Sequence, residues 1–142
     1  MEVELVVDYQ CQVGEGPLWH PVEKCLYWLD IPRGLVFVYD PSTKTHHVVY
    51  EGEPVGGMTL QADGSLLFLM TKGVIASWRK GKLTILTQIE GAYEQERRFN
   101  DAIADPMGRV YAGTMSSQDS TGRFYRINTD GTVVPLLENV KT

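Results

Sequence analysis

The chain repeats one arrangement of short apolar strands, and this repeat limits the fold more than any other feature of the sequence. A tight turn leads into a strongly apolar strand at residues 26–30, 66–70 and 110–114, so the period is about 40 residues. A shorter strand precedes each of these, and a second strand, a polar turn and a last strand follow it. The other expected strands span residues 16–19, 56–60 and 100–104, then 36–40, 75–79 and 124–128, and finally 46–50, 83–86 and 132–137.

Four strands in about 40 residues are the blade unit of a β-propeller. A four-stranded sheet with two apolar faces cannot bury both faces alone, whereas similar sheets stacked around an axis cover one another. We therefore expect an all-β fold, a β-propeller of three four-stranded blades in one domain, residues 1–142, with blades at about 13–52, 53–98 and 99–140. A β-sandwich of regular hairpins is the alternative. Three blades do not close a ring, so we expect either half of a longer protein or a chain whose copies close the ring together.

Composition excludes some functions. The 142 residues carry 13 basic and 18 acidic side chains, a net charge of −5, without the basic face that a nucleic-acid partner requires. No apolar run approaches the ~20 residues of a membrane span, and the acidic start lacks the features of a secretion signal. Cys11 and Cys25 are not spaced like a zinc site or a redox pair. We expect them to be reduced in a cytoplasmic protein, with a disulfide left open.

A carboxylate between two glycines is the first candidate for chemistry. Glu15 lies between Gly14 and Gly16, at the entry to the first short strand, where a sharp turn would direct it toward the propeller axis. Divalent cations such as calcium take oxygen ligands of this kind. The alternative is a solvated glutamate in a turn, because glycines are common in turns.

The second candidate opens the third repeat at the corresponding position. Arg97, Arg98 and Asn100 precede and begin the short strand there. An arginine fork can hold substrate oxygens, and an asparagine offers both a donor and an acceptor. A surface arginine beside an asparagine turn is the alternative. A third polar segment, residues 113–120, would line the mouth of a site or form an ordinary surface loop.

Other residues have expected structural roles. Trp19, Trp28 and Trp78 are expected to pack the blades. The Gly56–Gly57 pair and Gly113 suit places where strands crowd near an axis. The sequence contains no nucleophile elbow and no phosphate-binding loop.

These stretches resemble the family of senescence marker protein-30 (regucalcin), gluconolactonase and luciferin-regenerating enzyme. The resemblance is carried by residues 14–19, 27–32, 98–101 and 105–115, in matching order, and it extends over essentially the whole chain. It implies a six-bladed propeller, of which this chain resembles the N-terminal half. It also implies one divalent metal ion on the axis, calcium or zinc, and hydrolysis of sugar lactones.

Carried over residue by residue, the resemblance makes Glu15 the first metal ligand and makes Arg98 and Asn100 substrate contacts. An acidic substrate contact is expected after residues 113–115; Gln118 or Asp119 lies nearest, and Asp119 is the expected contact. The family's other ligands are an asparagine and an aspartate, and the aspartate is also the general base. Both are expected beyond residue 142, so the site of this half-length chain would be incomplete.

Two functions therefore compete at the level of sequence. The first is a metal-dependent, gluconolactonase-like sugar lactone hydrolase, of which this chain holds part of the site. The second is a non-catalytic calcium-binding or scaffold propeller module. In either case a homodimer of two half-rings could complete the propeller.

Overall fold

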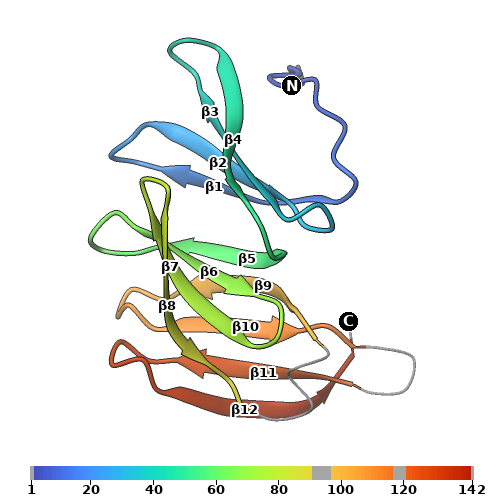
Figure 1. Ribbon diagram of the computed structural model, residues 1–142, viewed down its shortest axis with the longest axis vertical. Helices are drawn as coiled ribbons and strands as arrows, with labels where there is room; N and C mark the ends of the chain where they lie inside the picture. The colour runs from blue at the N-terminus through green and yellow to red at the C-terminus, as the bar shows by residue number, and fades with distance from the viewer. Residues whose placement is uncertain (1, 91–96, 117–120, 142) are drawn as a thin grey trace.

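The computed structural model describes residues 2–90, 97–116 and 121–141, which form three antiparallel sheets of four strands each (Figure 1). Each sheet is a meander in which consecutive strands pair. The first blade holds β1 Gly14–His20, β2 Cys25–Asp30, β3 Leu35–Asp40 and β4 Thr45–Glu51. The second holds β5 Val55–Leu60, β6 Leu66–Met70, β7 Val74–Arg79 and β8 Lys82–Gln88. The third holds β9 Phe99–Ala104, β10 Val110–Thr114, β11 Gly122–Ile127 and β12 Val133–Val140.

Every strand expected from the repeat is present, and the differences lie at the ends. The largest is β12, which continues to Val140 although its apolar run ends at Leu137. Pairing explains the extension, because Gly122 of β11 lies opposite Val140. Backbone hydrogen bonds to a neighbouring strand can thus carry a strand past its apolar residues. No helix long and apolar enough to cross a membrane occurs among the described residues.

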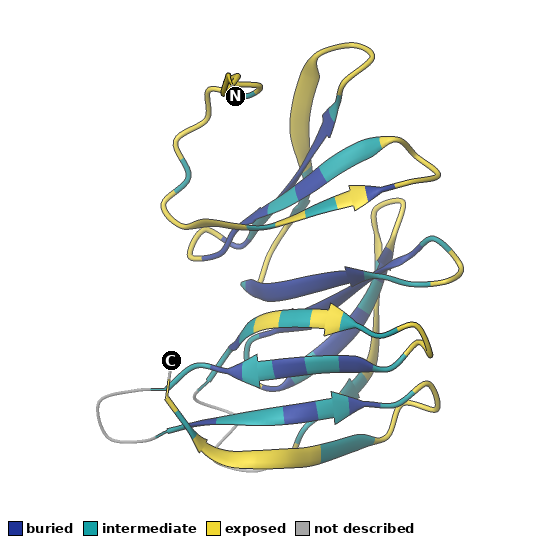
Figure 2. Ribbon diagram, turned by 180° about the vertical axis from the view of Figure 1, so that it is seen from behind, coloured by how far each residue is buried: buried dark blue, intermediate teal, exposed yellow. Residues whose placement is uncertain are grey.

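The second blade lies between the other two, and its strand β6 is buried on both faces. On β6, Leu66 and Phe68 join the apolar cluster shared with the first blade. Leu67 and Leu69 point to the opposite face and join the cluster shared with the third blade. All of β6 is buried, and Figure 2 shows the same for nearly all of β5. Face-to-face stacking of this kind is the packing expected of propeller blades.

The tryptophans follow the expectation only in part. Trp28 stacks on Phe37, and Trp78 stacks on Phe68 within the cluster between the first two blades. The expectation for Trp19 is wrong, because its side chain is 48% exposed on the inner strand of the first blade. Both cysteines are free and half-buried.

The inner strands β1, β5 and β9 run in the same direction, side by side (Figure 1). The closest approach confirms the direction for β5 and β9, since Gly56 lies against Phe99 and Gly57 against Asp101. The starts of these strands therefore gather at one end of the molecule. This is the end at which the sequence places its candidate functional residues.

Candidate functional site

Each inner strand carries a β-bulge near its start. The pairing with the next strand skips at residues 16–17 in β1, at Gly56 in β5 and at Asn100 in β9. Bulges bend a strand and redirect its side chains, and they are frequent beside functional sites. Two of the candidate residues, Glu15 and Asn100, lie at or next to a bulge. All three inner strands therefore share a bulge near their start, but the side chain at or beside the bulge differs from blade to blade.

Glu15 is exposed at the start of β1, opposite Leu29 of β2. Within the described part of the chain, its carboxylate makes no hydrogen bond and no ion pair. The next residue, Gly16, has a φ of +62°, a conformation that other residues adopt at a cost. Glu15 thus enters the bulge with an unpartnered carboxylate, which suits a ligand better than a structural side chain.

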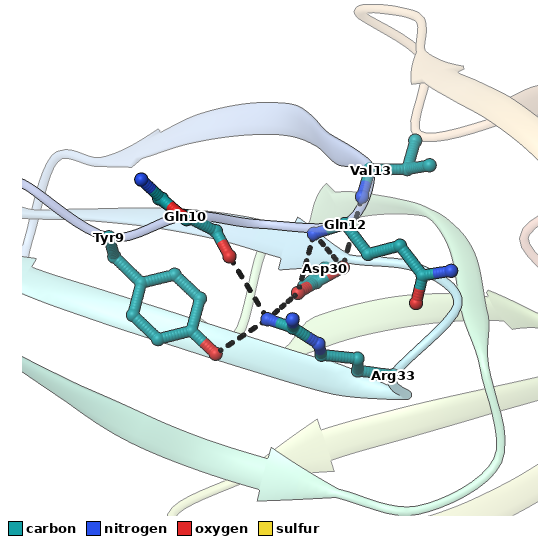
Figure 3. A network of polar contacts seen from close by, with 6 residues as sticks. All are labelled: Tyr9, Gln10, Gln12, Val13, Asp30 and Arg33. Carbon is teal, nitrogen blue, oxygen red and sulfur yellow. Dashed lines mark hydrogen bonds and ion pairs between the residues drawn. The ribbon is translucent and has the colours of Figure 1, made fainter.

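The turn before β1 is fastened by a buried carboxylate of its own blade (Figure 3). Asp30, at the end of β2, is fully buried and accepts hydrogen bonds from the backbone N–H groups of Gln12 and Val13, at 3.1–3.2 Å. Arg33 Nη1 lies 3.2 Å from Asp30 Oδ2 and also donates to Gln10 O at 3.0 Å. Several charge-assisted bonds therefore hold the segment that leads to the candidate ligand.

Arg98 and Asn100 lie together at the start of β9. Arg98 Nη1 donates to Phe99 O at 2.9 Å and to Asn100 Oδ1 at 3.5 Å. The backbone of Arg98 is held as well, because it bridges to Thr71 and its carbonyl accepts from Met115 N–H at 3.1 Å. The structure thus brings together the two residues expected to contact substrate and fixes them from both sides.

Close packing of β5 against β9 depends on the glycine pair. A Cβ atom at Gly56 would lie 1.7 Å from Phe99 O, and one at Gly57 would lie 3.0 Å from Asp101 C. The expected crowding is therefore confirmed at both positions. It is wrong at Gly113, where a Cβ would meet its nearest neighbours at 4.0 Å, an ordinary contact. The reason is that β10 is the second strand of its blade, one strand away from the crowded axis.

Other candidates are placed less directly. Arg97 donates from Nη1 to Met115 O at 2.8 Å, which gives it a structural contact. Gln118 and Asp119 lie outside the described residues. Asp30 was missed as a supporting residue. Its place at the end of a strong strand was visible in the sequence, but its bonds to residues 12–13 arise only when β1 pairs with β2.

Among the residues that the structure describes, Glu15 is the candidate ligand for a divalent metal. Among the described residues, no three His, Cys, Asp or Glu side chains gather closely enough to hold an ion. The exposed carboxylate of Glu15 fits an oxygen ligand for a hard cation. The described residues therefore offer one oxygen ligand of the kind that such an ion takes.

The fold and the site define a β-propeller with polar side chains at one end of its inner strands. The chain belongs to the SMP-30/Gluconolactonase/LRE-like family, whose model matches residues 13–142. It is 47% identical to Pentonolactonase XacC of Haloferax volcanii over 96% of this chain and 46% of that protein. It is 32% identical to human regucalcin over 83% of this chain and 40% of that protein. The chain thus spans about half the length of these curated relatives.

A solved structure supports the same fold. The crystal structure of a calcium-binding protein, regucalcin, from Agrobacterium tumefaciens superposes with a TM-score of 0.83 at 20% identity. The match covers 94% of this chain and 46% of that one. The expected fold class, three blades of a propeller, is therefore confirmed.

Proposed function

We propose that the protein containing this chain hydrolyses sugar lactones with the help of a divalent metal ion, calcium or zinc. In this proposal Glu15 is a metal ligand, and Arg98 and Asn100 contact the substrate. The observation that carries it is the convergence of the starts of β1, β5 and β9, which directs these residues to one end of the molecule. The family and its lactonase member at 47% identity supply the reaction class.

The side chains suit the reaction. Hydrolysis adds water across the ring ester, breaks the bond between the carbonyl carbon and the ring oxygen, and releases a hydroxy acid. Arg98 uses Nη1 for the bonds within β9, so its remaining N–H groups are without a partner among the described residues. They can donate to sugar hydroxyls or to the developing negative oxygen. The amide of Asn100 can both donate and accept.

The metal ion, when bound, would act as a Lewis acid on the lactone carbonyl. Glu15 would contribute one oxygen ligand, and its position is set by the bulge and by the segment bonded to Asp30. The proton of the attacking water would go to a general base, the aspartate expected beyond residue 142. Asp119, outside the described residues, stays a predicted substrate contact.

The test is lactone hydrolysis by the protein that contains this chain. Release of the acid from pentono- and gluconolactones is followed in a pH-stat, before and after treatment with a chelator. Glu15→Gln is expected to lower activity at least about 100-fold and to weaken metal binding, because an amide is a poorer ligand. The control is Glu51→Gln, an exposed glutamate at the end of β4, which should leave both unchanged. Full activity of Glu15→Gln, or activity indifferent to chelator, would contradict the metal-dependent mechanism.

A non-catalytic calcium-binding module is the second candidate, and the similarity to regucalcin favours it. It predicts that the protein binds calcium and hydrolyses none of the lactones above. Titration calorimetry with calcium, performed alongside the pH-stat assay, separates the two. Calcium binding without turnover would support the module and contradict the hydrolase.

Closure of the ring by two copies of this chain stays a prediction. It rests on the count of three blades in the described residues and on the symmetry that a dimer would supply. Light scattering of the purified chain after size exclusion tests it. A mass of two chains supports the dimer, and a mass of one chain contradicts it.

A further inference from the structure

The bulge residue of the second blade is a glycine, whereas the bulge residue of the third blade is an asparagine. Asn100 is the bulge residue of β9, and Gly56 is that of β5. In the first blade the candidate ligand, Glu15, stands directly before the bulge. The middle inner strand therefore adds no side chain at this level, although it lies between the two strands that do.

The backbone conformation does not require a glycine at this position. Gly56 is absent from the described residues with positive φ, so an alanine could adopt its backbone angles. The requirement is for space. A Cβ atom at Gly56 would stand 1.7 Å from Phe99 O and 2.5 Å from Phe99 C, both backbone atoms that cannot turn away. Any side chain there would move the start of β9.

The atom that Gly56 accommodates is the one that holds the arginine. Phe99 O accepts the 2.9 Å bond from Arg98 Nη1, and the same Nη1 would lie 3.4 Å from a Cβ at Gly56. A methyl group at Gly56 would thus displace the Phe99 carbonyl and also press on the guanidinium of Arg98. Because Asn100 follows directly and contacts Arg98, it would shift as well.

We propose that Gly56 is a positioning residue for substrate binding, which acts by letting Phe99 O and the Arg98 guanidinium lie where β5 and β9 meet. The inference rests on the proposed function of Arg98 and Asn100. In this inference the second blade contributes to the site by leaving space for the start of β9. The neighbouring Gly57 also packs against β9, since a Cβ atom there would lie 3.0 Å from Ala102 N and Asp101 C.

A double-mutant cycle tests the proposal in the protein that contains this chain. We expect Arg98→Ala to lower kcat/KM for the lactone about 100-fold, and Gly56→Ala to lower it about 30-fold, mainly through KM. If Gly56 acts through Arg98, the double variant should lose only about 100-fold, because a displaced arginine has little left to lose. Thr84→Ala, an exposed residue of the outer strand β8, is the control and should stay within about twofold of the parent.

Two results would overturn the inference, and they differ in what else they affect. If the losses multiply to about 3,000-fold in the double variant, Gly56 acts on stability or elsewhere in the site, and the proposed function survives. If Arg98→Ala keeps full activity, the substrate role of Arg98 fails and the inference fails with it. Should Gly56→Ala not fold, Gly57→Ala replaces it in the same cycle, since its milder overlap presses on the same strand.

Discussion

The starts of β1 and β9 are held in different ways, although both carry candidate functional residues beside a bulge. The start of β1 is fixed from within its own blade, by hydrogen bonds from the preceding turn to the buried carboxylate of Asp30. The start of β9 is fixed from the neighbouring blade, by backbone that packs against Gly56 and Gly57. The start of β1 is held by polar contacts, and the start of β9 by close packing between blades in addition to its hydrogen bonds.

The difference bears on how each residue can serve. A candidate metal ligand on an anchored turn keeps its carboxylate exposed and unpartnered, which leaves it available to an ion. The proposed substrate contact, Arg98, needs a defined direction, and it obtains one from the Phe99 carbonyl, whose place is set by two strands at once. Breaking either support should therefore disturb one candidate and spare the other, and this can be measured.

The largest effect is expected from removing the side chain that anchors β9 in the core. Phe99 is completely buried between the second and third blades, so Phe99→Ala should lower the free energy of unfolding by about 4 kcal/mol. Urea denaturation measures the loss. Phe124→Ala, a half-buried ring stacked on Tyr111, is the control and should cost less than half as much. Equal losses would mean that β9 is not held by the interface between the blades.

The next effect concerns the polar anchor of β1. Asp30→Ala removes the acceptor of Gln12 and Val13 and leaves the guanidinium of Arg33 without its carboxylate, so the free energy of unfolding should fall by about 3 kcal/mol. Asp30→Asn keeps the size of the side chain and one acceptor oxygen, so it should lower the free energy of unfolding by less. Both are measured by urea denaturation.

Amide hydrogen exchange tests whether the effect of Asp30→Asn is confined to the start of β1. In Asp30→Asn the amides of Gln12 and Val13 should exchange faster, while that of Met115, bonded to Arg98 O, should keep its protection. A general rise in exchange would contradict a local anchor. Unchanged exchange at residues 12–13 would mean that Asp30 does not anchor the start of β1.

The architecture could be predicted from the sequence because the same pattern of apolar strands repeats three times. All the strands follow from runs such as residues 66–70, and family resemblance points to Glu15, Arg98 and Asn100. The crowding at Gly56–Gly57 also agrees with the expectation. Strand pattern is a local signal, which explains its success.

What could not be predicted depends on pairing between strands. The bonds of Asp30 to the preceding turn require the alignment of β1 with β2, which no local pattern records. Gly113 looked like an axial glycine, yet its strand lies one step outward. Trp19 looked like a packing residue, but the inner strand turns it outward. Strand composition predicts that a residue lies in a strand more reliably than it predicts the direction of the side chain.

A smaller effect is expected at the opposite end of β1, where His20 forms a hydrogen bond between the first two blades. His20 Nδ1 accepts from Glu23 N–H at 3.1 Å, so Nε2 carries the proton and donates to Gly64 O at 3.1 Å. His20→Ala should lower the free energy of unfolding by about 2 kcal/mol, because the ring is 2% exposed. His47→Ala, exposed on β4, should change it little. Since this contact lies far along β1 from Glu15, metal affinity should be unchanged in both variants.

The smallest effect comes from turns between strands, in which an aspartate accepts hydrogen bonds from the residue two positions later. The Ser65 hydroxyl and N–H donate to Asp63 Oδ1 at 2.7 and 2.9 Å, and these bonds hold the pKa of Asp63 below its usual value. The pKa of Asp40 is lowered in the same way by Ser42, and that of Asp130 by Thr132.

A lowered folded-state pKa means that the ionised carboxylate is favoured in the folded protein. The stability that it contributes is present above the unfolded pKa of about 4 and is lost as the pH falls through the lower folded value. Ser65→Ala should therefore raise the pKa of Asp63 toward its usual value and leave that of Asp40 in place, as followed by NMR titration of the side-chain carboxyls. If both pKa values move, the two turns are coupled through the structure between them and are not independent local features.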